Sequence, residues 1–366
     1  MSDSAINSGA TTLARAAHWV RREVKALSAY HVPDSANFIK LDAMENPYHW
    51  PEQMVDDWLA VLRDVSLNRY PDPSPAGLKA SLAEAMGVPE GMDVILGNGS
   101  DELIQIIALA LAQPGRVILA PEPSFVMYKM IATFTGMEYV GVPLADDFSL
   151  DMDVLLAAIE QHQPAVVFLS YPNNPTGDLF DRKAVSAVIK ASPGLVVVDE
   201  AYHAFAGDSF MDELGKYDNL VVMRTVSKMG LAGLRLGLLA GPSEWLAEFD
   251  KVRLPYNINV LTQASAEFAL SRREVLEEQT RQICVDRELL MAELQKIGGV
   301  KPFPSRANFI LFRVPNAAEV FAALKEHKVL IKNMGATQGP LAQCLRVTVG
   351  TAEENAVFLK VLRQVL

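Results

Sequence analysis

The stretch Thr225–Arg235 (TVSKMGLAGLR) holds the residue types with the most distinctive chemistry. It follows an apolar run, Leu220–Met223, that predicts a buried strand. Lys228, just past this strand, is either a solvated charge or a Schiff-base lysine, because desolvation lowers a lysine pKa and frees the amine to attack an aldehyde. Ser227 and Arg235 offer a hydroxyl and a guanidinium, which suit a dianionic phosphate.

A second candidate is the acidic sequence after the apolar run Leu195–Val198. Asp199 ends that run, and a carboxylate at the end of an apolar strand is costly unless it is paired. A protonated pyridine nitrogen would be a suitable partner, and Tyr202 would reach a phenolic oxygen. The alternative is a carboxylate that caps the following helix.

Gly97–Glu102 (GNGSDE) follows a third apolar run, Val94–Leu96. Its glycines predict a turn with Ser100 or Asp101 as the N-cap of a helix, and also a phosphate cradle at the positive end of that helix. Both interpretations can hold together. The pattern is not GxGxxG with a downstream acid, which disfavours a dinucleotide.

Three further residues follow or lie within apolar runs. Phe125, at a helix start, either packs in the core, which spacing alone favours, or lies flat on a planar ring. Asn174, in the turn YPNNPTG, is either a turn residue or an amide donor to a ring oxygen. Arg346, in the strand around Leu345 and Val347, points away from both neighbours, toward solvent or toward a cleft where it would clamp an anion.

One ligand would match the side chains at all of these strand ends: a planar pyridine with a phosphate arm, a phenolic oxygen and an aldehyde. That ligand is pyridoxal phosphate. The strands that would position it alternate with amphipathic helical patterns, which predicts an α/β fold with a mostly parallel seven-stranded sheet flanked by helices. In such sheets ligands gather at the carboxyl ends of the strands. The seven predicted strands are Val94–Leu96, Val117–Leu119, Tyr139–Val142, Val166–Leu169, Leu195–Val198, Leu220–Met223 and Leu236–Leu239.

The flanking segments predict a three-part chain: an N-terminal arm and helix (1–50) against the small domain or a partner, a large cofactor-binding domain (51–260), and a smaller C-terminal α/β domain (261–366). Apolar periodicity also predicts the helices of the chain and the strands of the small domain. The predicted helices are Leu13–Ala29, Glu52–Val65, Ser243–Val252, Val260–Leu270, Arg272–Ile297, Ala317–Glu326 and Glu353 to the end, and the small-domain strands are Asn308–Phe312, Val329–Ile331 and Cys344–Val349.

Composition narrows the classes of partner. The 366 residues carry a net charge of −11 and a pI near 5.1, which argues against a nucleic-acid backbone binder and fits a cytoplasmic protein. Cys284 and Cys344 are far apart and predict reduced core residues, without a disulfide framework or a metal-binding cluster. No signal peptide and no run of membrane-spanning length is expected.

Across nearly its whole length the sequence closely resembles the histidinol-phosphate aminotransferases, within the fold-type-I group of pyridoxal-phosphate enzymes. The motifs that carry the resemblance are LDAMENPY, NRYPDP, GNGSDE, YPNNPTG, VVVDEAY, RTVSKMGLAGLRLG and CLRVTVG. It implies transfer of the amino group between L-histidinol phosphate and 2-oxoglutarate in histidine biosynthesis. It also implies a homodimer with shared active sites.

The resemblance implies a role for each matching residue. Lys228 would form the Schiff base and move the proton, Asp199 would pair with the pyridine nitrogen, and Tyr202 and Asn174 would bind the phenolic oxygen. Phe125 would stack on the ring where many relatives have tyrosine. Phosphate contacts are implied for Ser100, Asp101, Ser227 and Arg235, with Tyr70 reaching the partner subunit's cofactor. Substrate contacts are implied for Arg346, Tyr30, Asn174, Tyr256 and Lys332.

Two departures from the family pattern stand out. The loop from Lys228 to Arg235, SKMGLAGLR, is a shorter form of SKAFALAGLR, and Lys332 stands where relatives often have a second anion-binding arginine. Lysine keeps the charge and loses the bidentate fork. The alternatives are an aromatic or broad-specificity aminotransferase and a phospho-amino-acid decarboxylase on the same scaffold. A non-catalytic ligand sensor would need a DNA-binding domain and a basic patch, which the first ninety residues do not offer.

Overall fold

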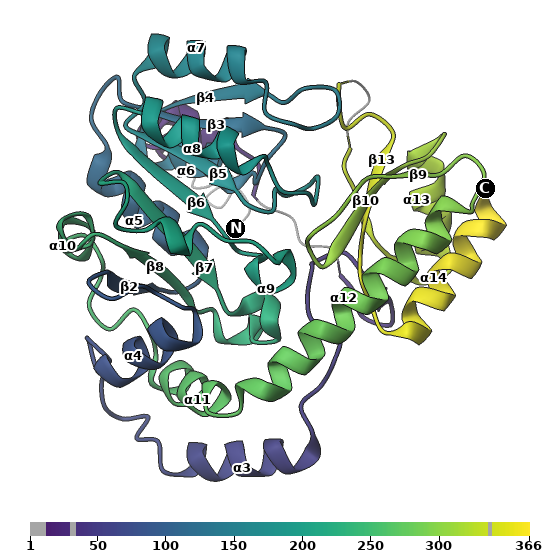
Figure 1. Ribbon diagram of the computed structural model, residues 1–366, viewed down its shortest axis with the longest axis horizontal. Coiled ribbons are helices and arrows are strands. Elements are labelled where there is room, and N and C mark those ends of the chain that lie inside the picture. Colours follow the sequence, from purple (N-terminus) through teal and green to yellow (C-terminus); the bar gives the residue numbers. More distant parts are fainter. Residues whose placement is uncertain (1–11, 30–33, 336–338) are drawn as a thin grey trace, which may run out of the picture.

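The larger of the two bodies in Figure 1 is built on a seven-stranded sheet in the order β2-β8-β7-β6-β5-β3-β4. The computed structural model describes residues 12–29, 34–335 and 339–366. Strands β3 to β7 run parallel, and β8 is antiparallel to both of its neighbours. The strands are β2 (Asp93–Gly97), β3 (Val117–Glu122), β4 (Glu138–Pro143), β5 (Val166–Ser170), β6 (Leu195–Asp199), β7 (Leu220–Thr225) and β8 (Gly237–Gly241).

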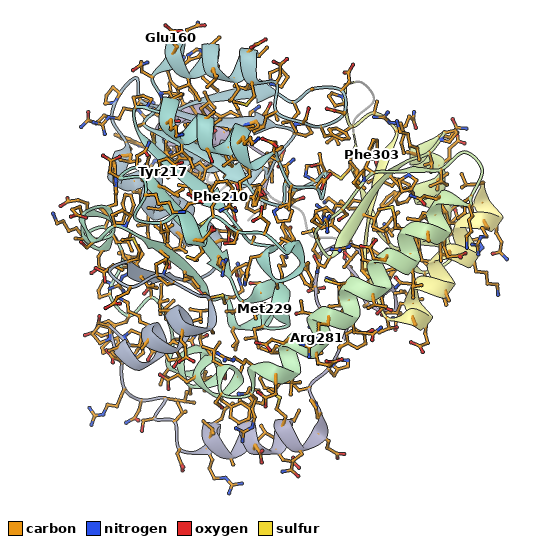
Figure 2. The ribbon with its side chains drawn as sticks, in the orientation of Figure 1. Glu160, Phe210, Tyr217, Met229, Arg281 and Phe303 are labelled. Carbon is orange, nitrogen blue, oxygen red and sulfur yellow. The ribbon has the colours of Figure 1, made fainter. Side chains whose placement is uncertain are left out.

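Helices cover both faces of this sheet, because alternate side chains of each buried strand project to opposite faces. On β3, Val117 and Leu119 pack with α4, α7 and α8, whereas Ile118 and Ala120 pack with α5, α6 and α10. These helices are α4 (Ala76–Ala85), α5 (Ser100–Leu111), α6 (Met127–Thr135), α7 (Met152–His162), α8 (Arg182–Ala191) and α10 (Ser243–Asp250). Figure 2 shows side chains filling these layers, including Phe210, which is fully buried.

A second, antiparallel sheet in the order β12-β13-β10-β9 forms the smaller body on the right of Figure 1. Its helices α13 and α14 pack against each other, and α12 runs diagonally between the two bodies. Its elements are β9 (Lys301–Pro302), β10 (Phe309–Arg313), β12 (Lys332–Asn333), β13 (Cys344–Thr348), α12 (Arg273–Gln295), α13 (Ala317–Glu326) and α14 (Ala352–Val365). The side chain of Thr351 caps α14 in a capping box with Glu354.

The segment that precedes the large body joins the smaller one. Strand β1 (Ile39–Lys40) pairs in parallel with β11 (Val329–Leu330), and Thr348 of β13 donates its backbone N–H to Leu41. The chain then enters the large body through α3 (Glu52–Arg63), on which α11 (Val260–Leu270) packs. The short elements are α2 (Arg22–Lys25), α9 (His203–Ala206) and the 3-10 turns η1 (Met211–Glu213), η2 (Ser227–Met229) and η3 (Ala232–Leu234).

The seven predicted strands of the large sheet are all present, and so are the helices predicted beyond residue 50. The prediction of one helix over Leu13–Ala29 is wrong: residues 12–19 are helical, the helix stops, and α2 covers only four residues. Its side chains stay exposed, so no buried face holds a continuous helix together. Among the described residues no helix is long and apolar enough to cross a membrane.

Candidate active site

The polar strand ends meet in one pocket at the carboxyl edge of the large sheet. Strand β2 runs in the same direction as β7, since both are antiparallel to β8, so the residues that follow β2, β3, β5, β6 and β7 share one edge. The pocket lining includes Met44, Ser100, Asp101, Phe125, Ser170, Asn174, Asp199, Ala201, Tyr202, Thr225, Ser227, Lys228 and Arg235.

Lys228 lies in η2, directly after β7, with its Nζ 3.3 Å from the carbonyl oxygen of Ala43. The amine also lies 5.7 Å from the ring centre of Tyr202. Burial lowers the pKa of this amine to about 8, and the positive charges of Arg346 and Arg235 act in the same direction. A pKa near 8 leaves about a quarter of the amine neutral at pH 7.5, against about one part in a thousand for an ordinary lysine. The neutral fraction of this amine is the form that can act as a nucleophile.

Asp199 ends β6 and is almost fully buried. Its Oδ2 accepts a 2.7 Å hydrogen bond from the hydroxyl of Tyr128, and its Oδ1 accepts one from the N–H of Ala201 at 3.1 Å. Burial raises the pKa of the Asp199 carboxyl to about 6, and these two donors oppose the rise. Above this pKa the carboxyl is ionised, and a cation bound beside it in the pocket would stabilise the buried negative charge.

Asn174 joins the two bodies of the molecule. Its amide nitrogen donates to the Tyr202 hydroxyl at 3.2 Å, and its amide oxygen accepts from Nη1 of Arg346 at 2.5 Å. Nη2 of Arg346 donates to the carbonyl oxygen of Asp42 at 3.1 Å, and the guanidinium lies over the Phe309 ring. Burial raises the pKa of the Tyr202 phenol, so this hydroxyl stays protonated.

Arg346 thus faces the cleft between the bodies, not solvent; it is 6% exposed. Lys332 of β12 is its direct partner across the antiparallel ladder. Directly opposed residues of such a ladder project from the same face of the sheet, so the two cations lie side by side.

The opposite end of the pocket resembles an anion cradle. Gly99 is the N-cap of α5 and has a φ of +83°, a conformation that favours glycine. A Cβ added there would lie 2.7 Å from Nη2 of Arg235. The Arg235 guanidinium also meets Asp101 at 3.3 Å. The prediction of Ser100 or Asp101 as N-cap is wrong, because α5 already begins at Ser100, which leaves Gly99 as the N-cap residue.

Hydroxyl groups complete this end. Ser227 shares a 2.8 Å hydrogen bond with Thr225, and both line the pocket. Since the N-cap of α5 is a glycine, no N-cap side chain covers the first N–H groups of that helix. Free N–H groups at a positive helix end, two hydroxyls and a guanidinium match the needs of a phosphate.

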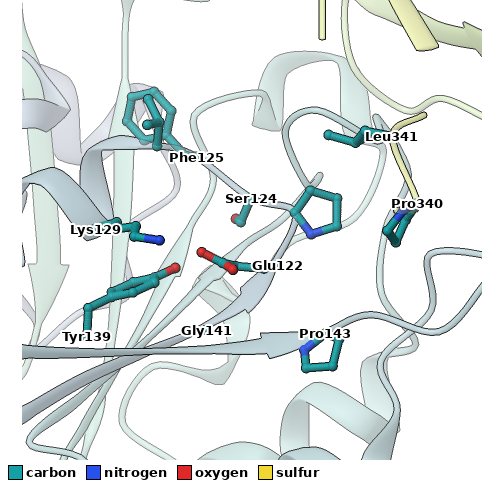
Figure 3. A pocket seen from close by; sticks show the side chains of 11 residues that line it. Glu122, Ser124, Phe125, Lys129, Tyr139, Gly141, Pro143, Pro340 and Leu341 are labelled. Atoms are coloured by element: carbon teal, nitrogen blue, oxygen red, sulfur yellow. The ribbon is translucent and has the colours of Figure 1, made fainter. Parts of the chain in front are cut away.

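Phe125 lines the pocket from the loop just before α6, and its ring meets Tyr128 edge-on with ring centres 5.7 Å apart. It also borders a second cavity, shown in Figure 3, where Lys129 and Tyr139 lie near Glu122 and the loop of Pro340 forms the far side. That neighbouring cavity lacks a nucleophilic lysine beside a buried acid. The chemistry outlined above therefore belongs to the pocket of Lys228.

Four predicted residues are not among those that line this pocket: Arg346 and Lys332, described above, and Tyr70 and Tyr256. Tyr70 and Tyr256 stack on each other with ring centres 4.6 Å apart, and Tyr70 is 81% exposed. Neither lines the pocket of Lys228. Tyr30, the third predicted aromatic contact, lies outside the described residues.

Sequence reasoning missed several residues of the site. Tyr128 donates to Asp199, and Met44 and Ala201 line the pocket. Tyr128 follows Phe125 by three positions, a spacing that places both on one face of a helix, but two aromatic residues at that spacing are more often core. Met44 comes from a segment more than 180 residues away in sequence from Lys228 and carries no chemical signal of its own.

Comparison with known proteins agrees with this geometry. Residues 36–362 match the family model "Aminotransferase class I and II". The chain belongs to this family. It is 57% identical over 351 residues to histidinol-phosphate aminotransferase 2 of Nitrosococcus oceani, covering 95% of this chain and 98% of that protein. It is 55% identical over 346 residues to histidinol-phosphate aminotransferase 2 of Cupriavidus pinatubonensis, covering 93% and 94%.

Solved structures of this family of aminotransferases share the fold. The histidinol-phosphate aminotransferase of Sinorhizobium meliloti, solved in complex with pyridoxal 5'-phosphate, superposes with a TM-score of 0.85 at 25% identity over 95% of this chain and 97% of that chain. The enzyme from Clostridium acetobutylicum gives 0.81 at 25% identity over 89% and 98%. The family implies a pyridoxal-phosphate cofactor, and the glycine cradle, the partly neutral lysine and the buried acid fit that group.

Proposed function

We propose that this protein is a pyridoxal-phosphate-dependent histidinol-phosphate aminotransferase (EC 2.6.1.9), which moves the amino group between L-histidinol phosphate and 2-oxoglutarate. The observation that carries the proposal is the 57% sequence identity to a protein with that name, over nearly the full length of both chains. The pocket of Lys228 supplies the chemistry that such a reaction requires. Phosphorylated substrates do not cross membranes unaided, so we infer that the protein acts in the cytoplasm.

The residues that would hold the cofactor come from five strand ends. When bound, pyridoxal phosphate supplies an aldehyde that condenses with amines and a ring that withdraws electrons from the reacting carbon. Asp199 would pair with the ring nitrogen, Asn174 and Tyr202 would contact the phenolic oxygen, and Phe125 would lie against the ring. The phosphate would contact Ser100, Asp101, Ser227 and Arg235.

Lys228 performs the proton transfers in this proposal. With its pKa near 8, the Nζ is neutral often enough to accept a proton and acidic enough to return it. The carbonyl oxygen of Ala43 orients the amine when it is free. The Tyr202 ring lies beside the amine, with its centre 5.7 Å from Nζ.

Arg346 and Lys332 would bind the anionic end of the substrate. A phosphate monoester carries up to two negative charges near pH 7, and two neighbouring cations match it better than one. Asn174 and the Asp42 carbonyl hold the Arg346 fork in place, which limits the entropy lost on binding. The same pair would bind the carboxylate of glutamate in the other half of the cycle.

We infer a homodimer in which Tyr70 and Tyr256 serve the partner's pocket. Both are exposed on this chain and lie near Leu67 and Leu254, each 72% exposed. Exposed apolar residues gathered in this way mark an interaction surface. We call these four residues the Tyr70 patch. A docked second copy would cover it and bring Tyr70 to a neighbouring cofactor phosphate.

We also infer that residues 1–50, 51–260 and 261–366 divide as an arm, a cofactor-binding domain and a small domain. Helix α11 begins at the second boundary and packs on α3 and α4 of the large body. The chain therefore crosses between the bodies along α11 and α12.

The substrate assignment is tested by comparing L-histidinol phosphate with L-histidinol as amino donors. Two cations facing the phosphate predict a kcat/KM at least about 100-fold higher for the phosphorylated donor, since each charge-assisted contact is worth about 1.5–3 kcal/mol. Equal values for both donors, or a preference for phenylalanine, would move the function to a broad or aromatic aminotransferase.

A further inference from the structure

Tyr128 contacts the site from outside the pocket. It lies in α6, fully buried, and its ring stacks on Phe168 with centres 4.7 Å apart and meets Phe125 edge-on. Two aromatic neighbours leave the ring no room to turn away. Its hydroxyl is aimed at Oδ2 of Asp199, 2.7 Å away.

The Asp199 carboxylate is therefore held at both oxygens. Tyr128 donates to Oδ2, and the N–H of Ala201 donates to Oδ1. Each carboxylate oxygen has two lone pairs, so the group can still accept from one more donor in the pocket. A carboxylate with both oxygens engaged has a fixed orientation.

The other groups around Asp199 make its ionisation harder. Asp101 of α5 and Glu200, next in the chain, are acidic and raise the pKa of the Asp199 carboxyl, in addition to burial. Arg224 of β7 pairs with Glu200 and offsets part of that charge. Tyr202 also faces this site and stays protonated. By donating to the carboxylate, the Tyr128 hydroxyl opposes burial and these acidic neighbours and favours the ionised form of Asp199.

Tyr128 keeps this donor at every working pH. Burial and the charge of Asp199 raise the pKa of its phenol well above the usual value. A hydrogen bond to a carboxylate favours the ionised acid, because the neutral acid accepts that bond more weakly.

We propose that Tyr128 is a positioning residue of the reaction: its hydroxyl keeps Asp199 ionised and oriented, so that a ring nitrogen paired with Asp199 retains its proton. This inference rests on the proposed role of Asp199. Loss of the hydroxyl makes the carboxylate more basic. A proton shared between the carboxylate and a ring nitrogen then moves toward the carboxylate, and the ring becomes a poorer electron acceptor.

The first test uses the apoenzyme and the variant Tyr128→Phe, which keeps the ring and removes only the hydroxyl. Carboxyl infrared difference spectra, assigned with Asp199→Asn, follow the ionisation of Asp199. The titration midpoint of Asp199 should be about one to two pH units higher in Tyr128→Phe than in wild type, which corresponds to the loss of one charge-assisted hydrogen bond. An unchanged midpoint would overturn the inference.

Tyr171→Phe is a matched control. Tyr171 is also a buried tyrosine, and its hydroxyl donates to a carboxylate, that of Asp208, at the same 2.7 Å. This variant should lose similar stability and leave the Asp199 midpoint where it is in wild type. An equal rise in both variants would assign the effect to general loosening of the core and reject the role of Tyr128.

A measurement on the wild type avoids any dependence on the folding of the variant. In protein labelled with ¹³C at the tyrosine Cζ, one signal should titrate with the Asp199 midpoint near pH 6 and lose that titration in Asp199→Asn. If no tyrosine signal follows Asp199, the proposed coupling is wrong.

The last test uses holoenzyme loaded with cofactor carrying ¹⁵N at the ring nitrogen. The ¹⁵N shift of wild type should be that of a protonated ring, and Tyr128→Phe should move it toward the unprotonated value. Wild type that takes up no cofactor would overturn the proposed function. Loading in both proteins with identical ¹⁵N shifts would overturn the inference alone.

Discussion

Burial shifts the pKa values of Lys228 and Asp199 in opposite directions, although both residues line one pocket. Desolvation lowers the pKa of the Lys228 amine to about 8 and raises that of the Asp199 carboxyl to about 6. Between these values the carboxylate is ionised and part of the amine is neutral. This window is centred near pH 7, and the proposed function requires both a nucleophilic amine and an anionic partner for a ring cation.

Replacement of Lys228 by alanine should remove the covalent attachment of the cofactor and lower turnover by at least about 1000-fold, because both the nucleophile and the proton carrier are lost. Absorbance and borohydride reduction followed by mass analysis measure the attachment. Lys129→Ala, in the neighbouring cavity, should retain it. A Lys228→Ala protein that borohydride still labels at one lysine would disprove the assignment.

Asp199 should make the apoenzyme less stable at neutral pH. Its folded pKa is raised from 3.8 to about 6, so the folded state binds the proton more tightly and stability falls as pH rises through that range. The free energy of unfolding of Asp199→Asn, measured with urea at pH 7.5, should therefore exceed that of wild type by up to about 3 kcal/mol. The difference should vanish toward pH 4. A less stable variant at pH 7.5 would contradict the raised pKa.

Residue types and their positions after apolar runs were sufficient to predict Lys228, Asp199 and Asn174 as pocket residues. They were insufficient for Tyr128, because its hydroxyl acts through a partner that only the fold brings near. Likewise the sequence left Arg346 between solvent and cleft. Strand alternation fixes which face a side chain takes and not what lies opposite that face.

Among the elements, a buried ion pair links the ends of β6 and β7, the strands that end at or just before the proposed site residues Asp199 and Lys228. Glu200 follows β6 and Arg224 lies on β7; both are buried, and Nε and Nη2 of Arg224 donate to Glu200 at 2.9 and 2.7 Å. The Phe210 backbone N–H and the Ser209 hydroxyl also donate to this carboxylate. Asp199 and Lys228 each lie within four residues of this pair.

Arg224→Met should destabilise the protein by about 3–5 kcal/mol, because it leaves the Glu200 carboxylate buried and unpaired. Urea unfolding of the apoenzyme measures the loss. The double variant Arg224→Met/Glu200→Leu should recover most of it, since no charge then remains buried. Arg281→Met, which removes an exposed pair with Glu278, should cost less than about 1 kcal/mol. Similar losses in Arg224→Met and Arg281→Met would argue against a buried pair of this strength.

The elements of the large sheet were predictable because their strands are continuous apolar runs between helical patterns. Of the two-residue strands, β11 falls within the predicted strand Val329–Ile331, whereas β9 and β12 were not predicted. β9 and β12 are too short to show a period, and β12 carries the polar residues Lys332 and Asn333. The prediction of one helix over Leu13–Ala29 was wrong for a different reason. The sequence has a helical period, but its side chains stay mostly exposed instead of packing on the rest of the chain.

At the scale of the whole molecule, the site is made by both bodies. Arg346 comes from the small sheet, Asn174 from the large one, and the segment of Asp42 and Met44 passes between them. Movement between the bodies would therefore change the substrate end of the pocket while leaving the anion cradle intact. The sequence predicted both units, and it could not predict how closely Arg346 and Asn174 meet.

The Tyr70 patch predicts that dimer formation and cofactor retention are linked. Leu254→Glu places a charge within the patch and should yield monomers in sedimentation experiments, together with faster loss of cofactor on dialysis. Leu289→Glu, at another exposed leucine on α12, should leave both unchanged. Monomeric wild type, or a Leu254→Glu dimer that retains cofactor normally, would contradict the shared site.

The proposed function is tested most directly by the absorbance spectrum of the cofactor-loaded protein before and after addition of L-histidinol phosphate without an acceptor, with phenylalanine as comparison. We expect a band of lysine-bound cofactor that L-histidinol phosphate converts to the amine form and that 2-oxoglutarate restores. Conversion by phenylalanine instead would contradict the proposed substrate. Absence of the band, even with added cofactor, would contradict the proposed role of Lys228.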